Sequence, residues 1–263
     1  MKISGVMPNS VGIILTTYNR PDFLEAVLRS VEQQTIHPQE IIVADDGSSP
    51  ITTELLGNYV QRLPIKHCWL PDNSFRAARS RNIAITKSKS KYLIFVDGDM
   101  LLPPTFVENH LRLSQPGKIV AGNRVLLSKD ATKRLLNRAD QKAHLYAFKS
   151  MKFLQLRLGK LRDLIGNDWK KVRTCNLSLF KDDILKAEGF DESFIGWGRE
   201  DSDFIVRCIH NGFRIRNGRF AITCAHLWHE ESPRFTLSHN EVRLNLTLSE
   251  RLHKPTKSIV QQL

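Results

Sequence analysis

The sequence predicts an α/β fold in which a central sheet, mixed but mostly parallel, is flanked by helices in a single domain. Three observations predict it. Short apolar, β-branched runs alternate with amphipathic helical patterns through the first hundred residues. These runs are apolar throughout, as in strands that a parallel sheet buries on both faces. At 263 residues the chain can also bury a core without disulfides or a structural metal.

The predicted elements alternate along the first part of the chain. The strands are expected at 11–16, 40–44, 65–70 and 92–96, and the helices at 21–31, 51–63 and 75–85. After about residue 115 the alternation weakens. There we expect strands at 174–180 and 220–226, a helix at 181–188, a loop from 189 running into a helix by 203, and a polar helical tail over 239–263.

Polar clusters follow three of the predicted strands, at residues 16–20, 45–48 and 97–99. Right-handed crossovers bring the carboxyl ends of parallel strands to one edge of a sheet, and open sheets bind their ligands there. The sequence therefore predicts a ligand site formed by these clusters.

The net charge is +12, and the segment 129–173 holds 13 Lys/Arg against 4 Asp/Glu. Such an excess favours phosphates, anionic lipid head groups or acidic polymers as partners. We expect the segment to contact an anionic membrane or an acidic acceptor, and the alternative is a solvated helical face. The chain contains no known nucleic-acid recognition motif, so no nucleic acid is expected as a partner.

The four cysteines form no CxxC pair, which favours a reducing, cytoplasmic compartment. The apolar run at 11–15 is too short for the core of a signal peptide, and no stretch approaches the roughly 20 apolar residues of a membrane span. We therefore expect a cytoplasmic protein whose membrane contact, if present, is peripheral.

Two carboxylates follow the predicted strand at 92–96. Asp97 and Asp99 are separated by Gly98, and at this spacing both can converge on one divalent cation. A glycine between them permits a sharp turn or a close approach of the backbone to a ligand. The alternative is an ordinary Asp-Gly surface turn.

Two histidines near the predicted strand at 220–226 are the second candidate for metal binding. His226 and His229 are three residues apart and can share one ion. The alternatives are packed imidazoles or a structural zinc site that also uses Cys224 and Cys208, although these spacings match no usual zinc pattern.

Other polar residues could bind a nucleotide. A carboxylate of Asp45 or Asp46 could accept hydrogen bonds from a base or a ribose, and the alternative is helix capping by Asp46 or Ser48. A second group consists of three arginines on one short helical stretch, Arg76, Arg79 and Arg81. These guanidinium groups could clamp a diphosphate, and the alternative is a solvated basic face.

The run Gly-Trp-Gly at 196–198 precedes three acids within four residues. The glycines make a loop that presents a flat indole, on which a sugar ring can stack, and a neighbouring carboxylate can take a hydroxyl proton. An acidic helix N-terminus is the alternative reading of the acids, but it leaves the Gly-Trp-Gly unexplained.

These segments, in this order, resemble the inverting family 2 glycosyltransferases of the GT-A fold over about residues 11–235. The C-terminal half is most similar to bacterial chondroitin-polymerase domains and β-1,4-galactosyltransferases. The motifs that support the resemblance are TTYNRP at 16–21, DDGS at 45–48, NSFRAARSRN at 73–82, DGD at 97–99 and GWGRED at 196–201. Phe75 departs from the pattern, since many members of the family have glycine at this place.

The resemblance implies one GT-A domain over 1–263. It has a nucleotide-sugar-binding half at about 11–115, an acceptor-binding half at about 116–235 that includes the basic segment 129–173, and a helical tail at 236–263.

The resemblance also implies roles for the motif residues. Asp201 would be the general base, and Glu200 would contact the donor or acceptor sugar. Trp197 and Gly198 would line the acceptor site. The implied cofactor is Mn²⁺ or Mg²⁺, held by Asp99 and His229 with His226 in addition. The implied nucleotide-binding residues are Thr16, Tyr18, Arg20, Asp46, Arg76, Arg81 and Asp97.

The implied activity is metal-dependent transfer of a hexose or N-acetylhexosamine from a UDP-sugar to a hydroxyl of a glycan or lipid-linked acceptor. The product would be β-linked, and the donor would be of the UDP-Gal, UDP-GalNAc or UDP-Glc type. We expect a role in bacterial surface polysaccharide or lipopolysaccharide assembly. Three other classes are alternatives: a nucleotidyltransferase, which would need a glycine-rich phosphate loop that residues 16–20 lack, a non-catalytic sugar- or nucleotide-binding domain, and a basic membrane- or nucleic-acid-binding protein.

Overall fold

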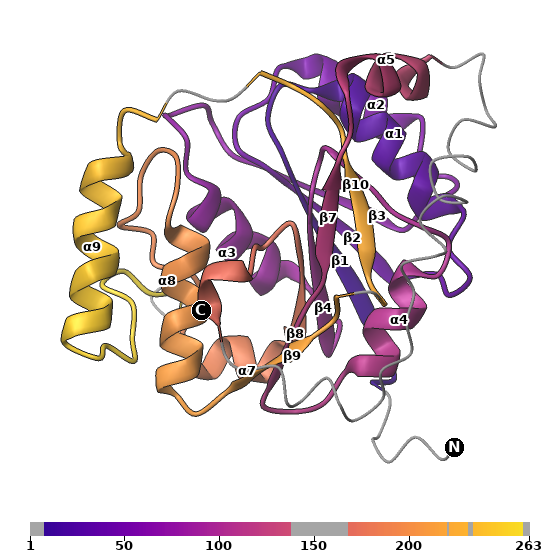
Figure 1. The fold of residues 1–263 in the computed structure, drawn as a ribbon. Coiled ribbons are helices and arrows are strands. Elements are labelled where there is room, and N and C mark those ends of the chain that lie inside the picture. Colours follow the sequence, from indigo (N-terminus) through magenta and orange to yellow (C-terminus); the bar gives the residue numbers. More distant parts are fainter. Residues whose placement is uncertain (1–7, 138–167, 220, 231–233, 260–263) are drawn as a thin grey trace.

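The computed structural model describes residues 8–137, 168–219, 221–230 and 234–259 (Figure 1). Within these ranges a seven-stranded sheet crosses the centre of the molecule in the order β3-β2-β1-β4-β8-β6-β9. Its strands are β1 (Val11–Thr17), β2 (Glu40–Asp45), β3 (Ile65–Trp69), β4 (Tyr92–Asp97), β6 (Lys118–Ala121), β8 (Asn176–Phe180) and β9 (Arg214–Asn217). Strands β1 to β4 pair in parallel, and β8 runs antiparallel to both β4 and β6. The predicted mixed, mostly parallel sheet is confirmed.

Helices cover both faces of this sheet. Neighbouring residues of β1 point to opposite sides, with Ile13 in one core cluster and Ile14 in the other, which is why the run is apolar throughout. One face packs against α1 (Pro21–Glu32), α2 (Pro50–Gly57) and α4 (Phe106–Leu113). The opposite face packs against α3 (Ala77–Lys87), α7 (Lys181–Lys186) and α8 (Glu200–His210). The remaining helices are α5 (Lys129–Leu136), the short 3₁₀ helix η3 (Trp169–Lys171) and α9 (Leu237–Ser249).

A second sheet of three short strands joins the two halves of the chain. Its strands are β5 (Met100–Leu101), β10 (Thr223–His226) and β7 (Asn123–Leu126). β10 runs antiparallel to β5, with His226 opposite Met100, and parallel to β7. Since β5 begins three residues after β4 ends, this pairing brings the end of β10 to the end of β4.

Three predicted helices are shorter in the structure than expected, and α7 differs least, since it ends at Lys186 instead of residue 188. α2 ends at Gly57 instead of residue 63, because the backbone then tightens into turns in which the N–H groups of Asn58 and Tyr59 donate three residues back. This turn buries the Tyr59 ring in the core. The predicted tail helix ends at Ser249 instead of residue 263.

Residues 250–258, which follow α9, are held against the domain in turns and bends. The carboxylate of Asp191 accepts the backbone N–H groups of Thr256 and Lys257, and Ile259 is fully buried in the core. These tertiary contacts replace the hydrogen bonds of a helix. No helix in the described ranges is both long and apolar enough to span a bilayer, and all four cysteines are free thiols.

Most of the basic segment 129–173, for which we expected contact with an anionic membrane or an acidic acceptor, lies outside the described residues. Its two described ends form α5 and η3.

Candidate active site

The three polar clusters meet at one edge of the large sheet, as predicted. In the strand register Thr16 is opposite Asp97, and Thr17 is opposite Asp45. Gly98 lies against the end of β1, where its N–H donates to the carbonyl of Thr16 at 2.7 Å. A Cβ at Gly98 would come within 3.0 Å of that carbonyl oxygen, which explains glycine between the two acids.

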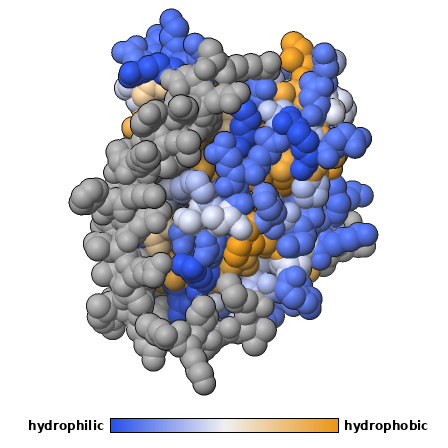
Figure 2. Space-filling view, turned by 90° about the vertical axis from the view of Figure 1, so that its right-hand side faces the viewer, coloured by the Kyte–Doolittle hydropathy of each residue, from blue (hydrophilic) through white to orange (hydrophobic). Residues whose placement is uncertain are grey.

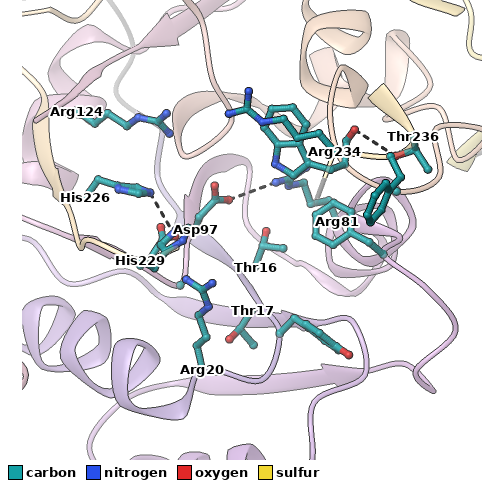
Figure 3. A pocket seen from close by; sticks show the side chains of 17 residues that line it. Thr16, Thr17, Arg20, Arg81, Asp97, Arg124, His226, His229, Arg234 and Thr236 are labelled. Atoms are coloured by element: carbon teal, nitrogen blue, oxygen red, sulfur yellow. Dashed lines mark hydrogen bonds and ion pairs between the residues drawn. The ribbon is translucent and has the colours of Figure 1, made fainter. Parts of the chain in front are cut away.

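A cavity of about 620 Å³ opens at this edge (Figure 3). Several separate parts of the chain line it, and many of their polar side chains point inward. The lining residues are Thr16, Thr17, Tyr18, Arg20, Phe75, Arg81, Asp97, Gly98, Asp99, Arg124, Gly196, Trp197, His226, His229, Arg234, Phe235 and Thr236.

One carboxylate and two imidazoles converge on one side of the cavity. Nε2 of His229 lies 3.0 Å from Oδ2 of Asp99, and Nε2 of His226 lies 3.4 Å from the same oxygen. The ligand atoms of these three residues all lie within 4.8 Å of one another. The backbone fixes the arrangement, because the N–H of Leu227 donates to the carbonyl of Asp99 next to the β5–β10 pairing.

The electrostatics of this group suit a divalent cation. Burial opposes ionisation of Asp99, but hydrogen bonds from His226 and His229 outweigh it and lower the pKa of Asp99. The same hydrogen bond raises the pKa of His229. Oδ1 of Asp99 is buried and has no hydrogen-bond partner among the described residues. An oxygen left in this state, beside two imidazole nitrogens, fits a metal ligand.

Within the described ranges, Cys208 and Cys224 join no group of metal-ligating side chains, so the alternative zinc site is wrong. The Cys208 side chain is fully buried in the core beneath α8, in a different cluster from Cys224.

Arg81 lies at the floor of the cavity between two carboxylates. Its Nη1 donates to Oε1 of Glu200 at 2.9 Å, and its Nη2 lies 3.3 Å from Oδ1 of Asp97 (Figure 3). The alternative of a solvated basic face is therefore wrong for Arg81, whose side chain is buried. Burial raises the pKa of Glu200, and the neighbouring Asp201 adds to the shift while Arg81 opposes it.

The GWGRED loop turns sharply into α8. Gly196 has a positive φ and packs so closely that a Cβ would come within 2.3 Å of Oγ1 of Thr236. Arg199 has the left-handed conformation just before the helix begins at Glu200. Both Glu200 and Asp201 thus occupy the first turn of α8, where the helix dipole favours negative charge. Oδ1 of Asp201 accepts the backbone N–H of Ser202 at 2.7 Å.

Trp197 lines the cavity, but one face of its ring is not open. The guanidinium of Arg234 lies over it, 4.7 Å from the ring centroid. Gly198 follows with a positive φ and lies beside α9, where its carbonyl accepts a hydrogen bond from Asn240.

The predicted nucleotide-binding residues divide into two groups. Thr16, Tyr18, Arg20, Arg81 and Asp97 line the cavity directly. Asp46 and Arg76 are not in its lining and bind each other, since the backbone N–H of Arg76 donates to Oδ2 of Asp46 and its Nε lies 3.7 Å from Oδ1. Burial raises the pKa of Asp46, and Arg76 opposes that shift.

Four lining side chains were not singled out from the sequence. Arg124 lies on β7, a strand too short to predict, and its guanidinium points into the cavity (Figure 3). Arg234, Phe235 and Thr236 come from the segment before α9. None of these three has a motif around it, although the GWG glycines indicate that another segment packs closely against that loop.

Comparison with known proteins shows two family matches. The chain matches Glycosyl transferase family 2 over residues 12–188 and the N-terminal domain of galactosyltransferase over residues 165–230. Among curated proteins it is 27% identical to the chondroitin synthase of Escherichia coli, over 86% of this chain and 35% of that protein. It is 26% identical to the validoxylamine A glucosyltransferase of Streptomyces hygroscopicus subsp. limoneus, over 80% of this chain and 50% of that protein. The chain thus spans half or less of the length of these relatives.

Solved structures share its fold. The crystal structure of S. aureus TarS superposes with a TM-score of 0.64 at 14% identity, over 91% of this chain and 39% of that one. The mannosyltransferase PcManGT from Pyrobaculum calidifontis, in complex with GDP-Man and Mn²⁺, gives a TM-score of 0.64 at 16% identity, over 93% of this chain and 65% of that one. The GT-A fold implied by the sequence motifs is thereby confirmed. Because the family 2 match covers most of the chain and runs through the strands that build the cavity, this protein belongs to glycosyltransferase family 2.

Proposed function

We propose that this glycosyltransferase moves a hexose or N-acetylhexosamine from a UDP-sugar to a hydroxyl of a glycan or lipid-linked acceptor, with inversion to a β-linkage. One observation carries the proposal: Asp99, His226 and His229 line the same cavity as Arg81, which binds Glu200 in the first turn of α8. A single buried guanidinium thus binds Asp97, two residues before the cation ligand Asp99, and Glu200, one residue before the candidate general base Asp201.

The first part of the proposal concerns the cation. We assign Asp99, His229 and His226 as its ligands, and the two imidazoles favour Mn²⁺ over Mg²⁺, which prefers oxygen. The cation would neutralise the charge that develops on the leaving diphosphate. In support, two structural neighbours are complexes with Mn²⁺.

The second part concerns proton transfer. We assign Asp201 as the general base that accepts the proton of the attacking hydroxyl. Because Oδ1 of Asp201 is engaged by Ser202, Oδ2 is the oxygen left to receive this proton. Glu200, held by Arg81, is placed one residue earlier to orient a sugar hydroxyl, and Trp197 and Gly198 border the space for the acceptor.

The third part concerns the donor. Thr16, Tyr18 and Arg20 would contact the nucleotide at the end of β1, with Asp46 and Arg76 supporting that wall. TarS structures hold UDP-GlcNAc or UDP, whereas PcManGT holds GDP-Man. The test of the donor therefore compares UDP with GDP. Galactose, N-acetylgalactosamine and glucose are the sugars that we would test first.

The test is thermal stability with UDP or GDP, each with Mn²⁺, with Mg²⁺ and with EDTA. A ligand at about 100 times its Kd adds roughly 2.7 kcal/mol of stability, a shift of several degrees for a domain of this size. We expect the largest shift with UDP and Mn²⁺ together, and none with UDP in EDTA. Equal shifts in EDTA would overturn the cation assignment, and a larger shift with GDP would overturn the choice of donor.

The location and biological setting stay predictions. We propose a cytoplasmic enzyme of bacterial surface polysaccharide or lipopolysaccharide assembly, in peripheral contact with the inner face of the plasma membrane through the basic segment 129–173. Flotation with phosphatidylglycerol vesicles at low and high salt tests the membrane contact. Salt-sensitive binding would support it, and absence of binding at low salt would remove it.

A further inference from the structure

A second cavity, of about 370 Å³, lies beside the N-terminal end of α8. The GWGR loop borders both cavities, since Trp197 lines the first and Arg199, two residues later, lines the second. α9, which packs along α8 (Figure 1), also reaches both. Its N-cap Thr236 is at the first cavity and Glu241 is at the second, about 7.5 Å further along the helix axis. The two cavities are therefore neighbours on one surface.

The second cavity is lined by more positive than negative charge. Lys170 and Arg173 come from the segment that leads into β8, and Arg199 comes from the start of α8. Glu241 is the one acid in the described lining, and Arg199 binds it at 2.7 Å. After this pair is formed, the charges of Lys170 and Arg173 are left to attract an anion.

One of these cations lies over an aromatic ring, and the other is anchored on the backbone. Nζ of Lys170 lies 5.8 Å from the ring centroid of Trp169. Arg173 is held in place by two bonds from Nη1, to the carbonyls of Lys170 at 2.8 Å and of Val172 at 2.6 Å. Both bonds use the same nitrogen, so the rest of the guanidinium fork is not engaged by them.

Arg199 shows further signs of a prepared site. Its Nε is buried and has no hydrogen-bond partner among the described residues. Its φ of 77° is in the left-handed region, which is uncommon outside glycine and is concentrated at ligand-binding positions. The lining also offers the hydroxyl of Ser202 and the amide of Asn245. An indole, a hydroxyl, an amide and a surplus of cations together suit a sugar that carries an acid.

We propose that this second cavity binds an acidic group, a carboxylate or a phosphate, on the sugar chain that accepts the transferred residue. The inference rests on the proposed function, because it places this group next to the acceptor hydroxyl at Asp201. Ser202 lines the second cavity, and its hydroxyl donates to Oδ1 of Asp201 at 3.3 Å, so an acid bound in this cavity would lie beside the proposed general base. The enzyme would thereby select acidic over neutral acceptors.

The test uses the full chain with UDP and Mn²⁺ and two oligosaccharides of equal length. Hyaluronan hexasaccharide carries carboxylates, and chitohexaose is neutral. The variant Lys170→Gln/Arg173→Gln removes two charges from the cavity. Its matched control, Lys171→Gln/Lys186→Gln, removes two charges from exposed lysines that form surface ion pairs with Asp168 and Asp183 and do not line the cavity.

Titration calorimetry should show tighter binding of hyaluronan hexasaccharide than of chitohexaose. The cavity variant should weaken binding of the acidic ligand about 10-fold or more, since it removes two cations that can form charged hydrogen bonds with the acid. The control should change its Kd less than about twofold, because exposed ion pairs contribute little. Competition by glucuronate or by glucose 6-phosphate then identifies the preferred acid.

Three results would overturn the proposal: no binding of the hexasaccharide, equal binding of both oligosaccharides, or equal loss in both variants, which would show attraction to net charge alone. The thermal shift with UDP and Mn²⁺ tests the proposed function separately, because it reports binding of the donor nucleotide and the cation and does not depend on the acceptor. A shift that persists in the cavity variant while acidic selectivity is absent would refute the acceptor site alone.

Discussion

Nη1 of Arg81 lies 2.9 Å from Oε1 of Glu200, and this ion pair joins residues 119 positions apart in the chain. It connects α3, which packs against the nucleotide end of the sheet, to α8, which starts the proposed acceptor side. The same guanidinium also meets Asp97. Arg81 is therefore a shared counter-ion for two acids that would otherwise be close and unpaired.

Arg81→Gln should destabilise the fold by about 3 kcal/mol, because it removes a buried guanidinium and leaves two partly buried carboxylates without their cation. Urea unfolding measures the loss. The double variant Arg81→Gln/Glu200→Gln should recover at least about 1 kcal/mol, since it removes one of the stranded charges. If the loss of unfolding free energy in the double variant equals the sum of the losses in the two single variants, Arg81 and Glu200 are not coupled.

Asp99→Ala should abolish the response to Mn²⁺, because it removes the carboxylate on which both imidazoles converge. An electron paramagnetic resonance titration of free Mn²⁺, run with UDP present, gives the affinity directly. Asp130→Ala, an exposed acid in the first turn of α5, is the control and should bind as the unmodified protein does. A normal Mn²⁺ affinity in Asp99→Ala would refute the assignment.

Asp201→Asn should lower the rate of sugar transfer by about 10²–10⁴-fold, the usual contribution of a general base. Binding of UDP with Mn²⁺ should stay within a few-fold, because the substitution leaves the cavity wall intact. Release of UDP from UDP-sugars in the presence of acceptor reports the rate. Asp182→Asn, which changes an exposed acid in the first turn of α7, should leave the rate unchanged. Lost UDP binding in folded Asp201→Asn would contradict the role.

Glu40 makes stability depend on pH at the acid end. Burial alone would raise the pKa of Glu40, but hydrogen bonds from Lys66, Ser88 and Ser90 lower it to about 2. A carboxyl with a depressed pKa stabilises the fold fully above its unfolded value near 4.3, and this stabilisation is lost as the pH falls through the folded value.

The shift corresponds to about 3 kcal/mol. Unfolding free energies of the protein and of Glu40→Gln should therefore differ clearly at pH 6, and the difference should narrow as the pH falls from 4.5 towards 2.5. A difference that is constant over this range would show that the ionised form of Glu40 gains nothing from its partners.

Strands β1, β2 and β4 could be predicted because each contains a continuous apolar run, and burial on both faces of a sheet demands such runs. The edge strand β3 has no such run, since it includes Lys66 and His67. The direction of β8 could not be predicted. Its residues fit a parallel or an antiparallel strand equally well, and long-range pairing with β4 and β6 decides between them. β5, β6, β7 and β9 have between two and four residues, too few for a periodic pattern.

The sequence could predict those parts of the candidate site whose residues are close together in the chain, as in Asp97–Asp99 or His226–His229. It was not predictable where two distant side chains share one partner. A single buried Arg81 between Asp97 and Glu200 has the same local sequence as an arginine on a solvated helix face. Arg124 was likewise hidden, because only the pairing of β7 with β10 turns it towards the cavity.

The pairing of β5 with β10 has a consequence for how the chain folds. Asp99 and His229 are 130 residues apart, so the ligand set is complete only after the C-terminal half has docked on the nucleotide half. Closing so long a loop is among the later and slower events of folding. An ion bound at these ligands would act as a cross-link between the two halves, and a chain whose C-terminal half is still unfolded offers it only Asp99. A chain whose two halves have not docked should therefore bind the cation more weakly than the folded protein does.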